Sequence, residues 1–263
     1  MGSDLSNKLL HLQGEVVLDI WYTFPATMGE DQAWISYNHG YGEVAESDPR
    51  HNVLRIKLPL KNPSETGMPT NEEYLQLSKI DEMLDEKFSE VGGVYVGRVT
   101  VDGHRFFYFY LNREEKQALE IIAEVTAETS YQMQYVHEKD TDKKFYWDQL
   151  YPTDDDWQVI QDLKVLDSLS ENGDMKDKER EVIHWAYFPS DSSCNYFAEW
   201  AKSENYELHF TGKDEDSSEC YTKFSHVGAM YLGNITNHTI KLGRKARELG
   251  GRYDGWETSV EKK

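Results

Sequence analysis

The sequence contains little cysteine and no long apolar run. Its 263 residues include only Cys194 and Cys220, too few for the disulfide framework of a small secreted domain. No stretch reaches the ~18 consecutive apolar residues of a membrane span. Residues 1–22 also lack the basic and apolar regions of a signal peptide. These absences predict a cytoplasmic protein that does not cross or bind a membrane.

Basic residues are scarce relative to acidic ones. The chain has 28 Lys and Arg against 48 Asp and Glu, a formal net charge of −20. Residues 1–150 hold 14 basic and 26 acidic residues (−12), and residues 151–263 hold 14 and 22 (−8). Because nucleic acid binding depends on cations that neutralise phosphates, this balance argues against a direct nucleic acid ligand. It favours either simple solubility or attraction to a partner with a basic surface.

The first half alternates strand and helix patterns. Runs of β-branched and aromatic residues predict strands at 17–24, 33–41, 52–60, 131–138 and 144–151. Apolar residues three and four positions apart predict a helix over 71–90, and a second helix is expected at 113–127. Asp102-Gly103 predicts a tight hairpin turn within 94–111. This order predicts an α+β domain in which helices cover one face of an antiparallel sheet.

Two details of the first half are also predicted. Pro25 is expected to end the first strand, because proline cannot donate to a sheet. Asn71 is expected to cap the helix that follows it, with acidic residues in the first turn favoured by the helix dipole.

The second half begins at a predicted domain boundary near residue 152, which gives domains 1–152 and 153–263. Thr153 or Asp154 can cap a helix that ends at Asn172-Gly173. The remaining predicted elements are strands at 180–188, 206–210, 220–230 and 252–260, and helices at 190–205 and 232–251. Strand-helix-strand-strand-helix-strand is the order of a ferredoxin-like fold. We therefore expect two antiparallel-sheet modules, the second of them ferredoxin-like.

The segment ELGGRYDGWETSV (248–260) has unusual composition for the end of a chain. Its glycine pair can end the preceding helix in the left-handed conformation, and Asp254-Gly255 predicts a bulge in a closing strand. Tyr253 and Trp256 are expected to pack on the sheet and to present OH and N–H groups at its rim. The segment should therefore be held in the sheet.

The C-terminal half resembles the bacterial inhibitors called regulator of ribonuclease E activity, type B. The resemblance rests on GGRYDGWETSV (250–260), REVIHWAYF (180–188) and CYTKF (220–224), and it covers about 154–263. It implies a cytoplasmic, non-catalytic module that binds a protein, with a ribonuclease as the implied partner. One departure is that the sequence ends at VEKK, without the long acidic tail associated with that family.

The N-terminal half is similar to the bacterial domain-of-unknown-function family 695. The similarity is carried by GMPTNEEYLQLSKIDEML (67–84) and YVGRVTVDGHRFFYFYL (95–111), together with the early aromatic strands. That resemblance implies no activity.

Chemistry of a catalytic or metal site is poorly represented. His184, His209, His226 and Cys220 lie in predicted strands but lack the close ligand spacing of a zinc site. Cys194 near a helix start, with His184 as base, is the one nucleophile pair to weigh, and no orienting third group accompanies it. We predict no metal, no cofactor and no catalytic residue, with an uncharacterised hydrolase using Cys194 and His184 as the less favoured alternative.

Binding residues are predicted among aromatic and acidic side chains. Aromatic anchors surrounded by acids are typical of an interface, although the same rings can equally form core. The candidates are Trp185, Tyr187, Tyr253, Asp254, Trp256, Glu257, Asp214, Glu215 and Asp216. The sequence thus predicts a non-catalytic regulatory protein, a protein-binding inhibitor, with an immunity-type antitoxin that binds a basic effector as the alternative.

Overall fold

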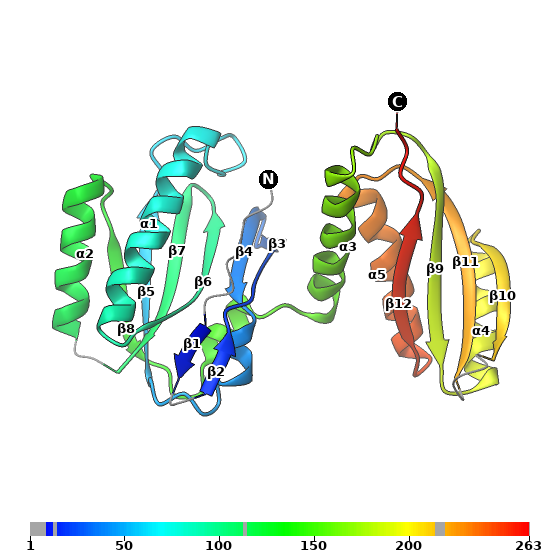
Figure 1. Ribbon diagram of the computed structural model, residues 1–263, viewed down its shortest axis with the longest axis horizontal. Helices are drawn as coiled ribbons and strands as arrows, with labels where there is room; N and C mark the ends of the chain where they lie inside the picture. Colours follow the sequence, from blue (N-terminus) through cyan, green and yellow to red (C-terminus); the bar gives the residue numbers. More distant parts are fainter. Residues whose placement is uncertain (1–8, 13–14, 113–114, 214–218, 263) are drawn as a thin grey trace. The chain divides into compact units, whose positions relative to one another are not determined.

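The computed structural model describes residues 9–12, 15–112, 115–213 and 219–262 (Figure 1). It divides into two compact units, residues 3–152 and 153–263. Each unit contains an antiparallel sheet with helices, which confirms the α+β class. None of the helices in the described ranges has both the length and the apolar composition needed to cross a bilayer.

The N-terminal domain is built on a six-stranded antiparallel sheet. Its order is β3 (Trp21–Met28), β4 (Asp31–Asn38), β6 (Val94–Val101), β7 (His104–Leu111), β5 (Asn52–Pro59) and β8 (Gln134–Lys139). Helices α1 (Asn71–Glu90) and α2 (Glu115–Thr129) pack side by side on one face (Figure 1). A separate hairpin pairs β1 (Leu9–Leu12) with β2 (Glu15–Leu18).

The core of this domain lies between the sheet and the two helices. The apolar stripe of α1, which includes Leu77, Ile80 and Leu84, is buried against strand residues such as Phe107 and Phe109. The hairpin between β6 and β7 turns at Asp102 and Gly103, whose φ angles are +44° and +68°. These are the positive values that a type I′ turn requires, so the sequence prediction for this hairpin is confirmed.

The single strand expected at 17–24 is divided between β2 and β3, which belong to different sheets. Three further local predictions for this domain are wrong. Pro25 lies inside β3 and pairs with Trp34, which is tolerated because β3 is an edge strand. The cap of α1 is Thr70, whose hydroxyl accepts from the Glu73 amide, and not Asn71.

Residues 144–151 are the third error, because no strand forms there. The carboxylate of Asp140 accepts hydrogen bonds from the amides of Lys144 and Phe145 at 2.9 and 3.0 Å, which starts a helical turn. The turn continues as the π-helical segment η2 (Tyr146–Leu150), and its ends, Tyr146 and Leu150, are both buried. With the 3₁₀ segment η1 (Gly40–Glu43), η2 packs at the face of the sheet that α1 and α2 leave open.

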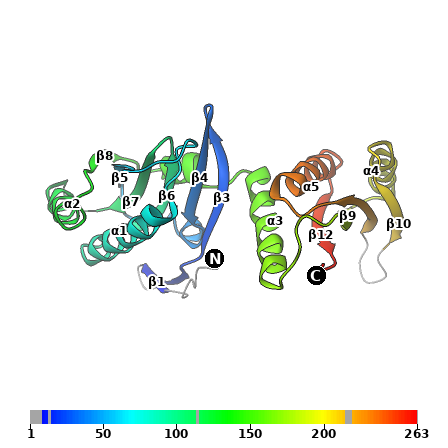
Figure 2. The same ribbon diagram turned by 90° about the horizontal axis from the view of Figure 1, so that it is seen from above.

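The C-terminal domain is built on a four-stranded antiparallel sheet. Its elements are α3 (Asp154–Glu171), β9 (Arg180–Phe188), α4 (Asp191–Ser203), β10 (Glu207–Lys213), β11 (Cys220–Gly228), α5 (Leu232–Glu248) and β12 (Arg252–Thr258). The strand order is β10-β11-β9-β12. This order, with α4 after the first strand and α5 after the third, is compatible with a ferredoxin-like arrangement. Figure 2 shows α4 and α5 on the same face of the sheet.

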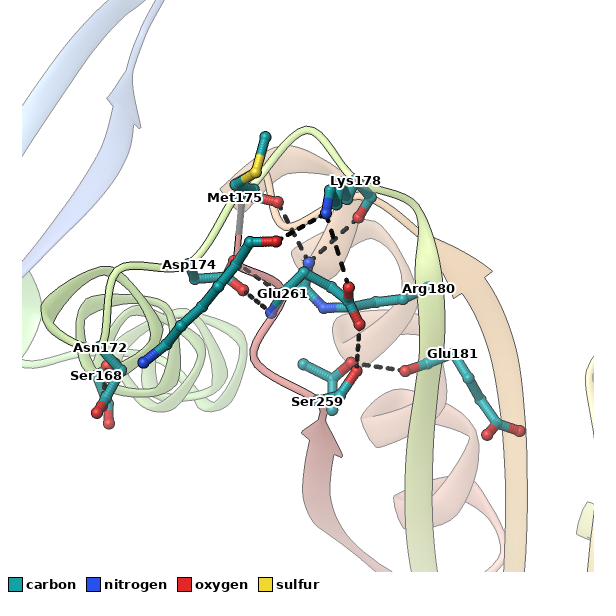
Figure 3. A network of polar contacts seen from close by, with 11 residues as sticks. Ser168, Asn172, Asp174, Met175, Lys178, Arg180, Glu181, Ser259 and Glu261 are labelled. Atoms are coloured by element: carbon teal, nitrogen blue, oxygen red, sulfur yellow. Dashed lines mark hydrogen bonds and ion pairs between the residues drawn. The ribbon is translucent and has the colours of Figure 1, made fainter.

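The end of the chain is fixed by β12 and by the segment that follows it. β12 pairs with β9, and its register shifts between Tyr253 and Gly255, which confirms the predicted bulge. Glu261 then bonds to the loop after α3 through its backbone: its N–H donates to Asp174 and its C=O accepts from Met175, both at 2.8 Å (Figure 3). Arg180 holds the same aspartate at 2.7 Å. The segment is therefore tied down, as the sequence predicts.

Helix α3 begins with a capping box that gives a testable contribution to stability. The Thr153 hydroxyl accepts from the Asp156 amide, and the Asp156 carboxylate accepts from the Thr153 amide. Thr153→Ala should lower the free energy of unfolding of the C-terminal domain by about 1 kcal/mol, measured by urea denaturation. Thr153→Ser keeps the capping oxygen and should stay close to the original protein, and an equal loss in both variants would contradict the capping explanation.

Candidate functional site

The most distinctive surface of the C-terminal domain is the face of its sheet that α4 and α5 do not cover. Along β9, even-numbered residues such as His184 and Ala186 are buried towards the helices, so odd-numbered residues point to the opposite face. In the described part of the domain, no helix packs on this opposite face. We call it the open face. Its side chains are Glu181, Ile183, Trp185 and Tyr187 on β9; Tyr221, Lys223, Ser225 and Val227 on β11; Glu207, His209 and Phe210 on β10; and Arg252 and Glu257 on β12.

Aromatic rings gather at one end of the open face. Tyr187 and Tyr221, which are paired across β9 and β11, stack with ring centroids 5.6 Å apart, and Tyr221 lies 5.1 Å from Phe210. Two cations sit over the rings: the Arg252 guanidinium is 4.4 Å from the Tyr187 centroid, and Lys223 is 5.1 Å from that of Trp185. Such contacts hold aromatic side chains in place at a surface.

Acidic residues occupy the other end of the open face. Glu181 accepts a hydrogen bond from the Ser225 hydroxyl at 3.0 Å, and its carboxylate lies 3.3 Å from Nε2 of His209. Glu207 and Glu257 are exposed beside it. At the aromatic end, Arg252 is neutralised by Glu219 at 2.6 Å. The open face therefore combines an aromatic end with an end of net negative charge.

Phe210 is the part of this surface that the sequence did not predict. The alternation of Tyr206, Leu208 and Phe210 indicates one common face, and the first two do pack towards the helices. The pairing of β10 with β11 shifts register between Leu208 and Phe210, so His209 is an extra residue. Phe210 is thereby moved to the open face, where 45% of its surface is exposed.

The structure separates the predicted aromatic candidates into two groups. Trp185 and Tyr187 lie on the open face, whereas Tyr253 and Trp256 point into the helix-covered core. Trp256 is only 8% exposed, and its Nε1–H donates to buried Asp162 at 2.9 Å. The Tyr253 hydroxyl lies 2.7 Å from Nδ1 of His184. The expectation that Tyr253 and Trp256 present their polar groups at a rim is wrong, because the bulge keeps both rings on the inner face.

The acidic candidates have different outcomes. Asp254 is exposed at the bulge, and Glu257 is exposed on the open face. Asp214, Glu215 and Asp216 lie outside the described residues. The strand before them, β10, ends at Lys213, and the strand after them, β11, begins at Cys220.

Three histidines form an array where the sheet meets α5, with His184 buried and His226 and His238 half-buried. Nε2 of His184 lies 2.8 Å from Nδ1 of His226, and the His226 ring stacks on that of His238 at 3.7 Å. Burial lowers the pKa of His184 well below its usual value, with the neighbouring histidines adding to the effect. Burial first, and then His238, lowers the pKa of His226 to about 4. At neutral pH the array is uncharged, so the Tyr253 hydroxyl can donate to His184, which in turn donates to His226.

The weighed nucleophile has the wrong environment for a reactive thiol. Cys194 is fully buried on α4, and burial, followed by a contact with Cys220, raises the pKa of its thiol. A nucleophilic cysteine requires a lowered pKa. Both ring nitrogens of His184 form contacts with Tyr253 and His226. Cys194 and His184 are therefore not arranged as a nucleophile and its base.

The residues weighed as metal ligands also lie apart. His184 and His226 are on the helix-covered face of the sheet, His209 is on the open face, and Cys220 is beside Cys194. Within the described ranges, no group of three or more His, Cys, Asp or Glu side chains is placed to hold a metal ion.

Comparison with known protein families finds two matches, one after the other along the chain. Residues 19–151, just over half of the chain, match the model of a family of unknown function, DUF695. Residues 159–258 match the model of Regulator of ribonuclease activity B. Both predicted resemblances, and their order, are confirmed. No curated protein matches the chain.

Two solved structures resemble the chain weakly. An unknown protein from Galdieria sulphuraria is 9% identical, with a TM-score of 0.21, over 80% of this chain and 99% of that one. A candidate glycine cleavage system transcriptional repressor is 4% identical, with a TM-score of 0.22, over 80% of this chain and 98% of that one. At these scores neither structure supports an argument about function.

Proposed function

We propose a function from the premise that this chain belongs to the DUF695 family of unknown function and continues into a domain like Regulator of ribonuclease activity B. The protein is a non-catalytic regulator. It would act in the cytoplasm by binding a protein with a basic surface and inhibiting it. The domain name itself describes a regulator, and a ribonuclease is the first partner to test.

The open face is the observation that carries this proposal. An uncovered sheet face with Trp185, Tyr187, Tyr221 and Phe210 at one end is unusual for a surface that meets only water, because burying such rings is strongly favourable. Aromatic residues are also the commonest anchors of protein interfaces. Rings already oriented by Lys223 and Arg252 lose little conformational entropy on binding.

The charge distribution supports a basic partner. The chain carries a net charge of −20, and Glu181, Glu207 and Glu257 lie at the acidic end of the open face. Complementary charge accelerates encounter and selects among partners. The aromatic end would supply affinity, and the acidic end would supply orientation.

The strand edges of the sheet are less suited to binding than its face. Both edge strands, β10 and β12, are interrupted by bulges, at His209 and at Asp254. Bulges are a device that prevents an edge from pairing with another strand. The bulged edges therefore favour contact through the open face.

An immunity-type antitoxin is a second use of the same surface. It would also block a basic effector through the open face, so the two functions differ in the identity of the partner. A toxin gene adjacent to the gene for this chain would favour the antitoxin.

The proposal predicts a separation between binding and folding. Affinity capture with mass spectrometry would identify the partner, beginning with a direct test of ribonuclease E, and isothermal titration would measure its affinity. Trp185→Ala should weaken binding at least tenfold, about 1.4 kcal/mol or more, while the circular dichroism spectrum is retained. Affinity should also fall as NaCl is raised, because exposed charge attraction is screened.

The control is Tyr196→Ala, which removes an aromatic side chain that is 68% exposed on α4. This variant should bind like the original protein. Unchanged affinity in Trp185→Ala, or binding that does not respond to salt, would rule out the open face as described.

A further inference from the structure

The N-terminal domain contains two arginines that share one aspartate. Asp81 projects from α1 and is almost completely buried. Its Oδ2 accepts from Nη1 of Arg105 at 3.0 Å and lies 3.7 Å from Nη1 of Arg98. Its Oδ1 accepts from the Tyr95 hydroxyl at 2.9 Å. Both arginines come from the β6–β7 hairpin, so the three charges are held by two packed elements.

This cluster has one positive charge more than it has negative charge. Two guanidinium groups and one carboxylate leave a net charge of +1, and among the described residues no second Asp or Glu oxygen lies within 4.0 Å of either arginine. Tyr95 does not compensate, since burial raises the pKa of its hydroxyl and keeps it neutral. An unbalanced charge away from bulk water is costly unless an opposite charge joins it. This local excess of positive charge stands out in an acidic part of the chain, since residues 1–150 carry 14 basic and 26 acidic residues.

The two arginines differ in their access to solvent. Arg105 is 3% exposed, and its Nε donates to the Thr100 hydroxyl at 3.1 Å, so its side chain is held in place by the neighbouring strand β6. The Arg98 side chain is 24% exposed. Arg98 pairs with Ser36 of β4, and the next pair on that face is Trp34 with Thr100. Trp34 is 39% exposed, whereas Ser36 and Thr100 are each 4% exposed, so around Arg98 it is the arginine side chain itself that reaches solvent.

We propose that Arg98 and Arg105 form a binding site for a single oxyanion group, a carboxylate or a phosphate. The anion would take its hydrogen bonds from the partly exposed guanidinium of Arg98, whose planar donors match both groups. Arg105 would supply positive potential without moving. Binding of a singly charged anion converts two cations and one anion into two of each, which removes the imbalance. The site lies in the N-terminal domain and does not depend on the function proposed for the open face.

The test is isothermal titration of the full chain with sodium phosphate and, separately, with sodium acetate. Chloride keeps the ionic strength constant in both titrations, so general screening does not contribute. We expect saturable binding of at least one anion, and at least a tenfold loss of its affinity in Arg98→Gln. Arg98→Lys keeps the charge but loses the planar donors, and it should bind with intermediate affinity.

Arg55→Gln is the matched control. Arg55 lies in the same sheet, but it has its own carboxylate, Glu138, at 2.8 Å. This variant should keep the affinity of the original protein. Binding of phosphate alone assigns a phosphoryl ligand, and binding of acetate alone assigns a carboxylate. The absence of saturable binding for both anions, or equal affinity in Arg98→Gln and the original protein, would overturn the proposal. Circular dichroism of each variant confirms that it is folded before the comparison is made.

Discussion

Replacing Asp162 with alanine is expected to destabilise the C-terminal domain by roughly 3 kcal/mol. Asp162 is fully buried on α3 and joins three elements. Its Oδ1 accepts from Trp256 of β12 at 2.9 Å, and its Oδ2 accepts from Thr239 of α5 at 2.5 Å. Gln158 donates to Oδ1 from one turn earlier in α3. Alanine would leave an indole N–H and a hydroxyl buried without an acceptor, and unmade hydrogen bonds of buried groups are costly.

Urea denaturation followed by circular dichroism measures this loss. Asp162→Asn keeps a carbonyl oxygen for one of the donors, so its loss should be smaller. Asp167→Ala, on the exposed side of the same helix, should change stability by less than about 0.5 kcal/mol. If Asp162→Ala is no less stable than Asp167→Ala, the carboxylate does not join α3 to the sheet.

Acidification is the second change with a large expected effect. The pKa values of His184, His226 and His238 are all lowered in the folded chain, chiefly by burial, and that of His226 falls to about 4. The unfolded chain binds protons at these histidines near pH 6.5. Between about pH 6.5 and about pH 4 the unfolded state therefore binds more protons, so stability falls as the pH falls.

Each histidine contributes up to ~1.4 kcal/mol per pH unit in this window. Two or three histidines would together lower the free energy of unfolding by roughly 2–4 kcal/mol per unit. Asp162 acts in the opposite direction, because burial raises its pKa, but it is one group against three. Stability should be fully retained above about pH 6.5 and should decline steeply between about pH 6 and about pH 5.

Urea denaturation across this pH range measures the slope. His226→Gln should be less stable near neutral pH but should show a shallower pH dependence, because one titrating group is gone. Phe224→Leu, a core change beside the array that alters no titrating group, should be destabilised with the original slope. Equal slopes in His226→Gln and the original protein would show that the array is not the source of acid sensitivity.

The element order follows from local signals that a single sequence contains. The positive φ angles of Asp102 and Gly103, the cap at Thr153 and the bulge after Tyr253 all depend on residues close together in the chain. The incorrect predictions relied on local patterns, and contacts with nearby residues or the position in the sheet outweighed those patterns. Asp140 turned an aromatic strand pattern into η2, and the edge position of β3 made Pro25 harmless.

The candidate site was predictable only in part. The period of β9 identifies Trp185 and Tyr187 as residues of one face, but it does not show which face the helices cover. Tyr253 and Trp256 looked equivalent to them and are core residues. Phe210 joins the open face only because the pairing of β10 with β11 shifts by one residue.

The sequence by itself determined the two α+β domains, most of their strands and helices, and the excess of acidic charge, because these depend on composition and on short-range periodicity. The tertiary structure alone decided which charges and rings meet. Asp81 and Arg105 are 24 positions apart, and His184 and His226 are 42 apart. Their contacts arise from strand order and helix placement, and no short-range pattern encodes them.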